Sequence, residues 1–371
     1  MSAPSLHGLR VLDFTRHLPG PFCTLLLADL GADVVKVEAP PYGDPTRVVP
    51  PAVGEDSAVH AALNRGKRSV LLDLHTEEGR AAARALAARA DVVVDGFRPG
   101  VLDRLGLGAD ALLAAHPRLV YCALSGWGTE GPLAGRAGHD ITYAARGGML
   151  DLNRDAAGAV TVPGVQVADG SGALLALSAI LAALVERERT GRGRRVDVSL
   201  LGGVLALLTM PLARTLAGGE RRSELSGDFA GYTVYRCRDG RELAVGALEP
   251  KFWEALCRGL GAEELIPRQW DGGARGREVR ARLTALFSGR DRDEWLRVLE
   301  PLDACVEPVL TPAEAAADAQ AAALLIDQPD GGGGAFRTVS PFAGSGLATA
   351  PPRPAPRLGQ HTGEVLAELA S

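Results

Sequence analysis

Three ionisable side chains lie where predicted loops meet predicted regular elements. His139 follows a Gly-rich loop, Asp169 precedes a long apolar segment, and Glu249 stands directly before Pro250. Asp169 occupies a position typical of a helix N-cap, where the helix dipole stabilises a carboxylate and free N–H groups can receive a second anion. Taken singly, each residue also has a structural interpretation: a hydrogen-bonded histidine, a plain cap and a charge at a helix start. Imidazole and carboxylate groups are the usual carriers of protons in catalysis.

Basic residues gather in or near the predicted strand ends of the first half of the chain. In an open parallel sheet, ligands bind outside the carboxyl ends of the strands. Basic side chains that converge there suit a phosphate-bearing ligand, and a solvated basic surface is the alternative. These residues are Lys36, Arg47, Arg65, Lys67, Arg68, Arg98 and Arg104.

Short apolar strands alternate with helices over the first 200 residues, which predicts a parallel sheet. The strands are near-continuous apolar runs, as expected when helices cover both faces, so the predicted fold is a doubly wound α/β domain. The turn after the first strand, Leu18-Pro19-Gly20-Pro21, lacks the G-x-G-x-x-G pattern, and a dinucleotide site is therefore disfavoured. The predicted strands span 9–14, 33–38, 69–74, 91–95, 119–125 and 195–199, and the helices include 22–30, 77–89, 99–105, 172–190 and 200–217.

The pattern changes near residue 227 to a hairpin followed by helices. The hairpin joins 233–236 to 242–245, and the helices span 250–260, 277–288 and 291–299, with a last short helix over 363–370. We therefore expect three regions. They are a large Rossmann-like α/β domain over 1–200 that is completed by 335–371, a linker helix region over 201–225, and a small α+β domain over 226–325.

Composition excludes several classes of protein. The chain has 371 residues, of which 46% are hydrophobic and 23% charged, so most of it is not disordered. The formal net charge of −5 offers no general basic surface for nucleic acid. Five cysteines without C-x-x-C spacing argue against a disulfide framework or a zinc site and for a reducing, cytoplasmic setting. No signal peptide is visible, and the longest apolar run, 173–185, is too short to span a bilayer, so no membrane insertion is expected.

Distinct motifs occur along nearly the whole chain. They include ADLGADVVKVE at 28–38, GFRPG at 96–100, SGWG at 125–128, AGHDITY at 137–143, AVGALEPKF at 244–252 and DACVEPVL at 303–310. Together they resemble the family III CoA-transferase superfamily. Transferases of this superfamily use one aspartate as nucleophile, at the position of Asp169, whereas its α-methylacyl-CoA racemases have the His and the Glu as well. This chain has all three residues, His139, Asp169 and Glu249, and so it looks most like the racemases.

The resemblance implies a reaction in which a 2-methylacyl-CoA thioester loses its α-proton and regains it on the other face. His139, supported by Glu249, would serve one face and Asp169 the other. The enolate formed between the two steps needs hydrogen-bond donors, and the backbone N–H groups of Gly170, Ser171 and Gly172 are the candidates. No metal or redox cofactor is expected, and coenzyme A enters as part of the substrate.

The resemblance also implies a CoA site and a quaternary structure. Family members are interlocked homodimers, so Glu249 is expected from the partner of the chain that supplies His139 and Asp169. Racemases commonly carry an arginine that packs on adenine where this chain has Ala39. The expected CoA-binding residues are Lys36, Leu72, Asp73, Leu74, His75, Gly96, Phe97, Arg98, Arg104, Gly138, Asp140, Ile141, Thr142 and Tyr143.

Two other functions remain open from the sequence. One is a CoA-transferase that forms an aspartyl-CoA thioester at Asp169, since that residue alone suits both branches. The other is a catalytically silent protein that binds CoA, because fold and scaffold do not by themselves determine function.

Overall fold

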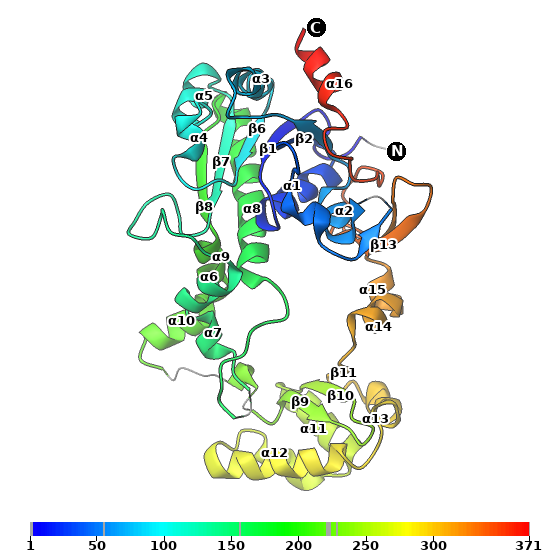
Figure 1. Ribbon diagram of the computed structural model, residues 1–371. Coiled ribbons are helices and arrows are strands. Elements are labelled where there is room, and N and C mark those ends of the chain that lie inside the picture. The colour runs from blue at the N-terminus through cyan, green and yellow to red at the C-terminus, as the bar shows by residue number, and fades with distance from the viewer. Residues whose placement is uncertain (1–2, 55, 156, 220–223, 228, 371) are drawn as a thin grey trace. The chain divides into compact units, whose positions relative to one another are not determined.

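A computed structural model describes residues 3–54, 56–155, 157–219, 224–227 and 229–370. The chain forms two compact units (Figure 1). The larger unit comprises Met1–Asp151, Ala156–Leu208 and Ala319–Ser371, and the smaller comprises Leu152–Asp155 and Thr209–Asp318.

A six-stranded sheet forms the centre of the larger unit, and every neighbouring pair of strands is parallel, as predicted. Its strands run in the spatial order β5-β2-β1-β6-β7-β8, which is the 3-2-1-4-5-6 order of Rossmann folds. Because the order reverses between β1 and β6, a crevice forms outside their carboxyl ends. The strands are β1 (Arg10–Phe14), β2 (Asp33–Glu38), β5 (Arg68–Leu71), β6 (Val92–Asp95), β7 (Val120–Ser125) and β8 (Arg195–Ser199).

Alternate side chains of each strand point to opposite faces of this sheet, and both faces are covered by helices. Leu12 and Phe14 of β1 join a buried cluster with α3 (Glu77–Ala87) and α5 (Ala109–Ala115). Between them, Asp13 points to the other face and accepts a hydrogen bond from Thr24 of α1. That face is covered by α1 (Pro19–Asp29) and by α8 (Val167–Thr190), which packs against α1, β7, β8 and α9 (Leu200–Leu207).

Helix α8 is longer than the sequence predicted, since it begins at Val167 and not after Gly172. Among the described residues it is the one helix long and apolar enough to cross a membrane, with a mean hydropathy of 1.8 over 18 residues. The apolar run at 173–185, which was predicted to be too short to span a bilayer, is therefore shorter than the apolar part of α8. A core helix meets the same criterion, and α8 packs against strands of the central sheet.

Shorter elements complete the larger unit. Helix α16 (Thr362–Ala367) near the C-terminus packs against β5, and its Val365 is buried in the sheet's core cluster. The chain also contains α2 (Ala58–Asn64), α4 (Val101–Arg104), α6 (Asp140–Arg146), α7 (Met149–Leu152), α15 (Ala319–Ala322) and the paired strands β3 (Ala52–Val53) with β4 (Asp56–Ser57) and β12 (Leu325–Pro329) with β13 (Ala335–Val339).

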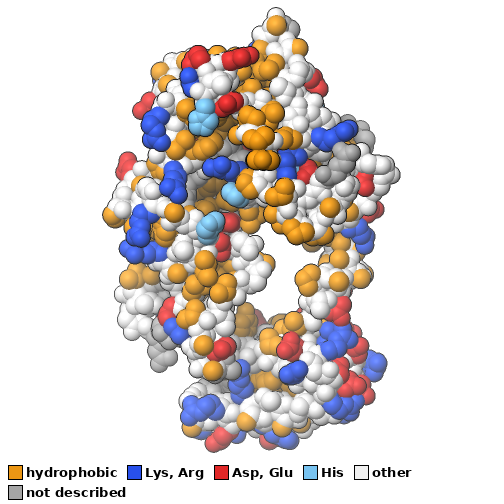
Figure 2. Space-filling model, in the orientation of Figure 1, with side chains coloured by type: hydrophobic (Ala, Val, Ile, Leu, Met, Phe, Trp, Pro, Cys, Tyr) orange, Lys and Arg blue, Asp and Glu red, His pale blue; other side chains and the backbone are white. Residues whose placement is uncertain are grey.

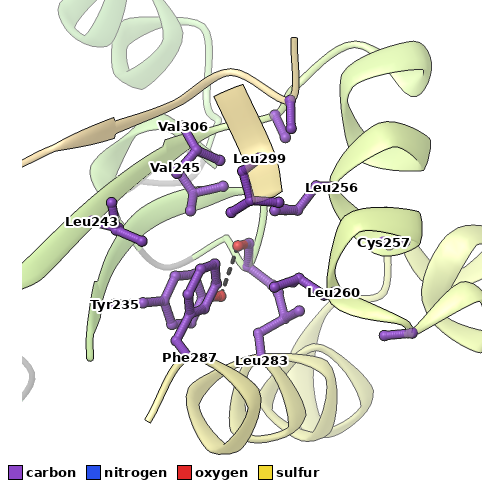
Figure 3. Packing of buried hydrophobic residues seen from close by; sticks show 14 of the residues in the cluster. Tyr235, Leu243, Val245, Leu256, Cys257, Leu260, Leu283, Phe287, Leu299 and Val306 are labelled. Atoms are coloured by element: carbon purple, nitrogen blue, oxygen red, sulfur yellow. Dashed lines mark hydrogen bonds between the residues drawn. The ribbon is translucent and has the colours of Figure 1, made fainter. Parts of the chain in front are cut away.

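The smaller unit is an α+β structure with its own core. Tyr235 of the hairpin stacks on Phe287 with ring centroids 4.7 Å apart (Figure 3). The rings of Phe287 and Trp295 meet edge to face with centroids 5.7 Å apart. The helix predicted over 200–217 is divided at Leu208 into α9 and α10. The unit's elements are β9 (Tyr232–Arg236), β10 (Glu242–Gly246) and β11 (Val306–Pro308) in one antiparallel sheet, with α10 (Thr209–Leu216), α11 (Pro250–Leu260), α12 (Gly273–Phe287), α13 (Arg292–Leu299) and α14 (Pro312–Ala317).

Candidate active site

A pocket of about 320 Å³ opens in the larger unit, outside the carboxyl ends of β1, β6 and β7. This is the point where the strand order reverses, and it is where open α/β sheets bind ligands. Basic and histidine side chains gather on this face of the larger unit (Figure 2). The pocket wall includes Thr15, Arg16, His17, Gly96, Phe97, Arg98, Ser125, Gly126, Arg136, Gly138, His139, Tyr143 and Asp169.

Asp169 lies on the pocket wall in the first turn of α8. It is the third residue of the helix, and Gln166 is the N-cap, so the predicted N-cap position of Asp169 is wrong. Its backbone N–H donates to Oδ1 of Asp140 at 3.0 Å. Burial and the neighbouring Asp140 charge raise the pKa of Asp169 to about 6, against the opposing influence of His139. A carboxyl group with this pKa can both release and accept a proton near neutral pH.

His139 is the N-cap residue of α6 and also lines the pocket. Its backbone N–H donates to Oγ1 of Thr142 at 3.0 Å, and that hydroxyl donates to the His139 carbonyl at 2.7 Å. The next residue, Asp140, accepts the bond from the Asp169 backbone. One hydrogen bond therefore joins the two helix starts that carry the imidazole and the carboxylate.

The ring of Tyr143 forms part of the same wall and is only 6% exposed. It meets Trp127 edge to face with centroids 4.7 Å apart. A Cβ atom on Gly126 would lie 2.2 Å from the Tyr143 hydroxyl, and one on Gly138 would lie 2.6 Å from its ring. Both positions therefore need glycine. Burial and the Asp169 charge raise the pKa of Tyr143, while Arg98 lowers it.

The predicted oxyanion donors are already used within α8. The N–H of Gly170 donates to the carbonyl of Gln166 at 3.0 Å. Ser171 and Gly172 follow inside the helix, where N–H groups bond to the preceding turn, so this prediction is corrected. Gly172 has a packing role instead, because a Cβ atom there would lie 2.4 Å from Cδ2 of Leu200.

The predicted CoA-binding residues divide between the pocket and other places. Gly96, Phe97, Arg98, Gly138 and Tyr143 line the pocket, while Asp140, Ile141 and Thr142 form the first turn of the adjoining α6. Leu72, Asp73, Leu74 and His75 follow β5, and Arg104 ends α4, away from the pocket lining.

Lys36 does not reach the pocket. Its side chain is fully buried, its ammonium group pairs with Oδ2 of Asp44 at 2.9 Å, and it donates to the carbonyl of Thr15 at 2.7 Å. Lys36 was predicted to contact a phosphate of CoA, but it holds Asp44 and Thr15 in place within the fold instead.

Glu249 belongs to the smaller unit. It is exposed and is the N-cap residue of α11, directly before Pro250, as its sequence position suggested. Its pairing with His139 stays a prediction.

Sequence reasoning missed the turn after β1. Arg16 and His17 line the pocket, and the guanidinium of Arg16 lies 5.4 Å from the ring centroid of Phe97. The signal was available, because this turn follows the strand at which the sheet order reverses, the usual ligand position.

Comparison with known proteins agrees with this geometry. A sequence model of CoA-transferase family III matches residues 6–362. An acyl-CoA transferase of Fusarium pseudograminearum is 38% identical over 99% of this chain and 85% of that protein. An alpha-methylacyl-CoA racemase of Mus musculus is 36% identical over 98% of this chain and 93% of that protein. A crystal structure of a CAIB/BAIF family protein from Brucella suis matches with a TM-score of 0.87 and 34% identity, over 99% of this chain and all of that one.

The chain belongs to CoA-transferase family III, as its motifs indicated. It is an enzyme of the superfamily that contains both CoA-transferases and racemases.

Proposed function

We propose that this enzyme is a racemase or epimerase of 2-methylacyl-CoA thioesters. The observation that carries the proposal is that His139 and Asp169 line one pocket and that a single hydrogen bond, from Asp169 N–H to Asp140, links their helix starts. Inversion at a carbon next to a thioester needs one acid/base group on each face of that carbon. An imidazole and a carboxylate with a pKa of about 6 suit that task.

The chemistry proceeds through an enolate. One base takes the α-proton, and the electron pair of the C–H bond moves into the C=C bond of the enolate while the thioester oxygen becomes negative. The conjugate acid of the other base then returns a proton to the opposite face, and the thioester carbonyl reforms. Each turnover exchanges the protonation states of His139 and Asp169, and no metal or redox step is needed.

We place the CoA portion of the substrate against the carboxyl ends of the strands. Arg98 lies on the pocket wall just after β6. Its guanidinium can bind a phosphate of CoA or the part of CoA next to the thioester. The residues at 72–75 and Arg104 remain the proposed contacts for the rest of CoA.

We also propose that the enzyme works as an interlocked homodimer in the cytoplasm. Apolar side chains of α8 and α9 are exposed in the single chain, among them Leu174 at 51%, Val185 at 62% and Leu207 at 59%. Exposed apolar faces of this kind favour a protein partner. In this dimer α8 is a core helix outside any membrane, and Glu249 of the partner subunit would hold the His139 imidazole.

A CoA-transferase is the second candidate, since relatives that are 32% and 35% identical carry that name. The carboxylate of Asp169 would then attack the thioester carbonyl and expel the CoA thiolate, which leaves a mixed anhydride. The thiolate would next attack the aspartyl carbonyl of this anhydride, release the first acid as a carboxylate and form an aspartyl-CoA thioester, from which CoA passes to the second acid. The position of Asp169 on the pocket wall supports this role as well.

One experiment separates the two. The enzyme is incubated in D₂O with one enantiomer of a 2-methylacyl-CoA, with binding shown in parallel. A racemase incorporates one deuterium at the α-carbon and yields both configurations. Recovery of unlabelled thioester, together with transfer of CoA to a free acid and an adduct trapped on Asp169, would instead establish the transferase.

A further inference from the structure

His17 holds a backbone conformation that L-residues rarely adopt. Its φ angle is 68°, in the left-handed region, and a histidine there costs free energy that glycine would not. Among the described residues two other non-glycine positions, Asp303 and Cys305, share this feature, and neither lines the pocket. Strained residues of this kind cluster at functional sites where the surrounding structure holds them.

A buried ion pair holds the turn that contains His17. The carboxylate of Asp44 accepts the His17 backbone N–H at 3.2 Å and pairs with the ammonium of Lys36 at 2.9 Å. Lys36 in turn donates to the carbonyl of Thr15 at 2.7 Å. Both charged side chains are fully buried, so the two ends of the turn are tied to one fixed pair.

Three other donors of this region are already engaged. The N–H groups of Asp169 and Gly170 bond to Asp140 and Gln166, and the hydroxyl of Thr15 donates to Asp13 at 2.5 Å. The side chain of His17 is exposed on the pocket wall and forms no hydrogen bond within the described part of the chain. Its imidazole is therefore free to donate to a ligand.

We propose that the His17 imidazole donates a hydrogen bond to the thioester oxygen of the bound acyl-CoA, where negative charge develops in the enolate. This assignment rests on the proposed function and adds a catalytic residue to His139 and Asp169. Donors fixed in advance toward a developing oxyanion lower the barrier more than those that must reorient.

The charge state of His17 suits this role. Partial desolvation against the pocket wall lowers the pKa of His17, and Arg16 and His139 lower it further, while Asp44 raises it. Near neutral pH the ring is therefore uncharged and carries one N–H donor. An uncharged ring also avoids repelling His139 when that imidazole takes up the α-proton.

The test compares two ligands that differ in one atom group. A 2-methylacyl-CoA thioester has the carbonyl oxygen, and the matching S-alkyl CoA thioether has a methylene there. We expect the wild type to bind the thioester about tenfold more tightly than the thioether. In His17→Gly, which accepts the left-handed backbone without strain, this preference disappears while thioether binding stays the same. Deuterium exchange falls about 10²- to 10³-fold in the same variant.

His7→Gly is the matched control, because it makes the same substitution at an exposed histidine that does not line this pocket. The proposal requires His7→Gly to retain the preference for the thioester. It is overturned if the wild type binds both ligands equally, if His17→Gly keeps the preference, or if His7→Gly loses it to the same extent. Failure of wild-type exchange would reject the racemase, whereas this binding comparison decides the role of His17 independently.

Discussion

At the scale of single residues, opposing influences set the pKa of the Asp169 carboxyl group. Its place in the first turn of α8 favours the charged form, because the helix dipole is positive there. Burial and the neighbouring charge of Asp140 disfavour it more strongly, and they raise the pKa of Asp169 to about 6. Near neutral pH both the ionised and the protonated form of Asp169 are therefore accessible, so the group can act as a base or as an acid.

This pKa predicts an acid limb in the activity profile. When Asp169 is the group that removes the α-proton, only its ionised form acts. We expect kcat/KM for deuterium exchange in that direction to fall about tenfold for each pH unit below 6. The measurement is exchange from a single enantiomer between pH 4.5 and 8. A flat profile through pH 5 would show that Asp169 is not the base.

The same pKa predicts that ionised Asp169 lowers the stability of the fold at neutral pH. A carboxyl whose pKa is higher in the folded than in the unfolded state stabilises the fold below pH 4, and this contribution is lost as pH rises through 6. Asp169→Asn should therefore raise the free energy of unfolding by about 1 kcal/mol at pH 7.5, after allowance for partial exposure, and change it little at pH 4. Urea unfolding at both values checks this, and equal effects at the two pH values would contradict it.

At the scale of elements, the strands of the central sheet and the starts of α3, α9 and α11 were predictable, whereas the start of α8 was not. The run DVVKVE holds three β-branched valines, which favour a strand, and β2 matches its predicted bounds. The start of α8 was missed because Val167 and Ala168 carry no capping signal. For that reason Asp169 was predicted to be the N-cap, whereas it lies in the first turn of the helix. Lys36 was misjudged because its partner Asp44 comes from a later turn, and a buried ion pair leaves no mark in sequence spacing.

The site itself was partly predictable. His139, Asp169, Arg98 and Tyr143 were found from motifs and do share one pocket. The turn that contains His17 could have been predicted as a ligand position, but the left-handed backbone of His17 could not, because it depends on three-dimensional contacts with Asp44.

The contact between Gly126 and Tyr143 gives a prediction at this scale. A methyl group at Gly126 would lie 2.2 Å from the Tyr143 hydroxyl, so the ring or the backbone must shift. We expect Gly126→Ala to lower the free energy of unfolding by about 2 kcal/mol and to weaken acyl-CoA binding. Chemical denaturation and titration with a CoA thioether provide the measurements.

Gly170→Ala is the matched control for this change. It lies in α8, and nothing lies within 4 Å of the added Cβ atom. Alanine favours helix there, so the free energy of unfolding should rise by about 0.5–1 kcal/mol. If Gly126→Ala is as stable as the control, the tight contact does not exist.

At the scale of the whole molecule, the two units have separate cores and divide the predicted chemistry between them. His139 and Asp169 belong to the larger unit and Glu249 to the smaller. In the proposed interlocked dimer, each active site combines the larger unit of one chain with the smaller unit of its mate. The residue trio would then exist only in the assembled dimer.

Hybrid dimers test this division. His139→Ala and Glu249→Ala chains, co-expressed with different tags, should be nearly inactive alone. A purified hybrid of the two should recover one intact site, with about half of the wild-type activity per dimer. A hybrid of His139→Ala with Asp169→Asn is the control and stays inactive, because both residues come from the same unit. An inactive first hybrid would show that Glu249 acts within its own chain or has no role.

The proposal that two different groups flank one carbon is tested most directly by deuterium exchange from each enantiomer separately. His139→Gln keeps Asp169, and Asp169→Asn keeps His139, so each variant retains one base. We predict that each variant still exchanges the α-proton of one enantiomer without inverting it, and that the two variants retain opposite enantiomers. If both variants lose exchange from the same enantiomer, or if Asp169→Asn still racemises, the two groups do not lie on opposite faces of the carbon.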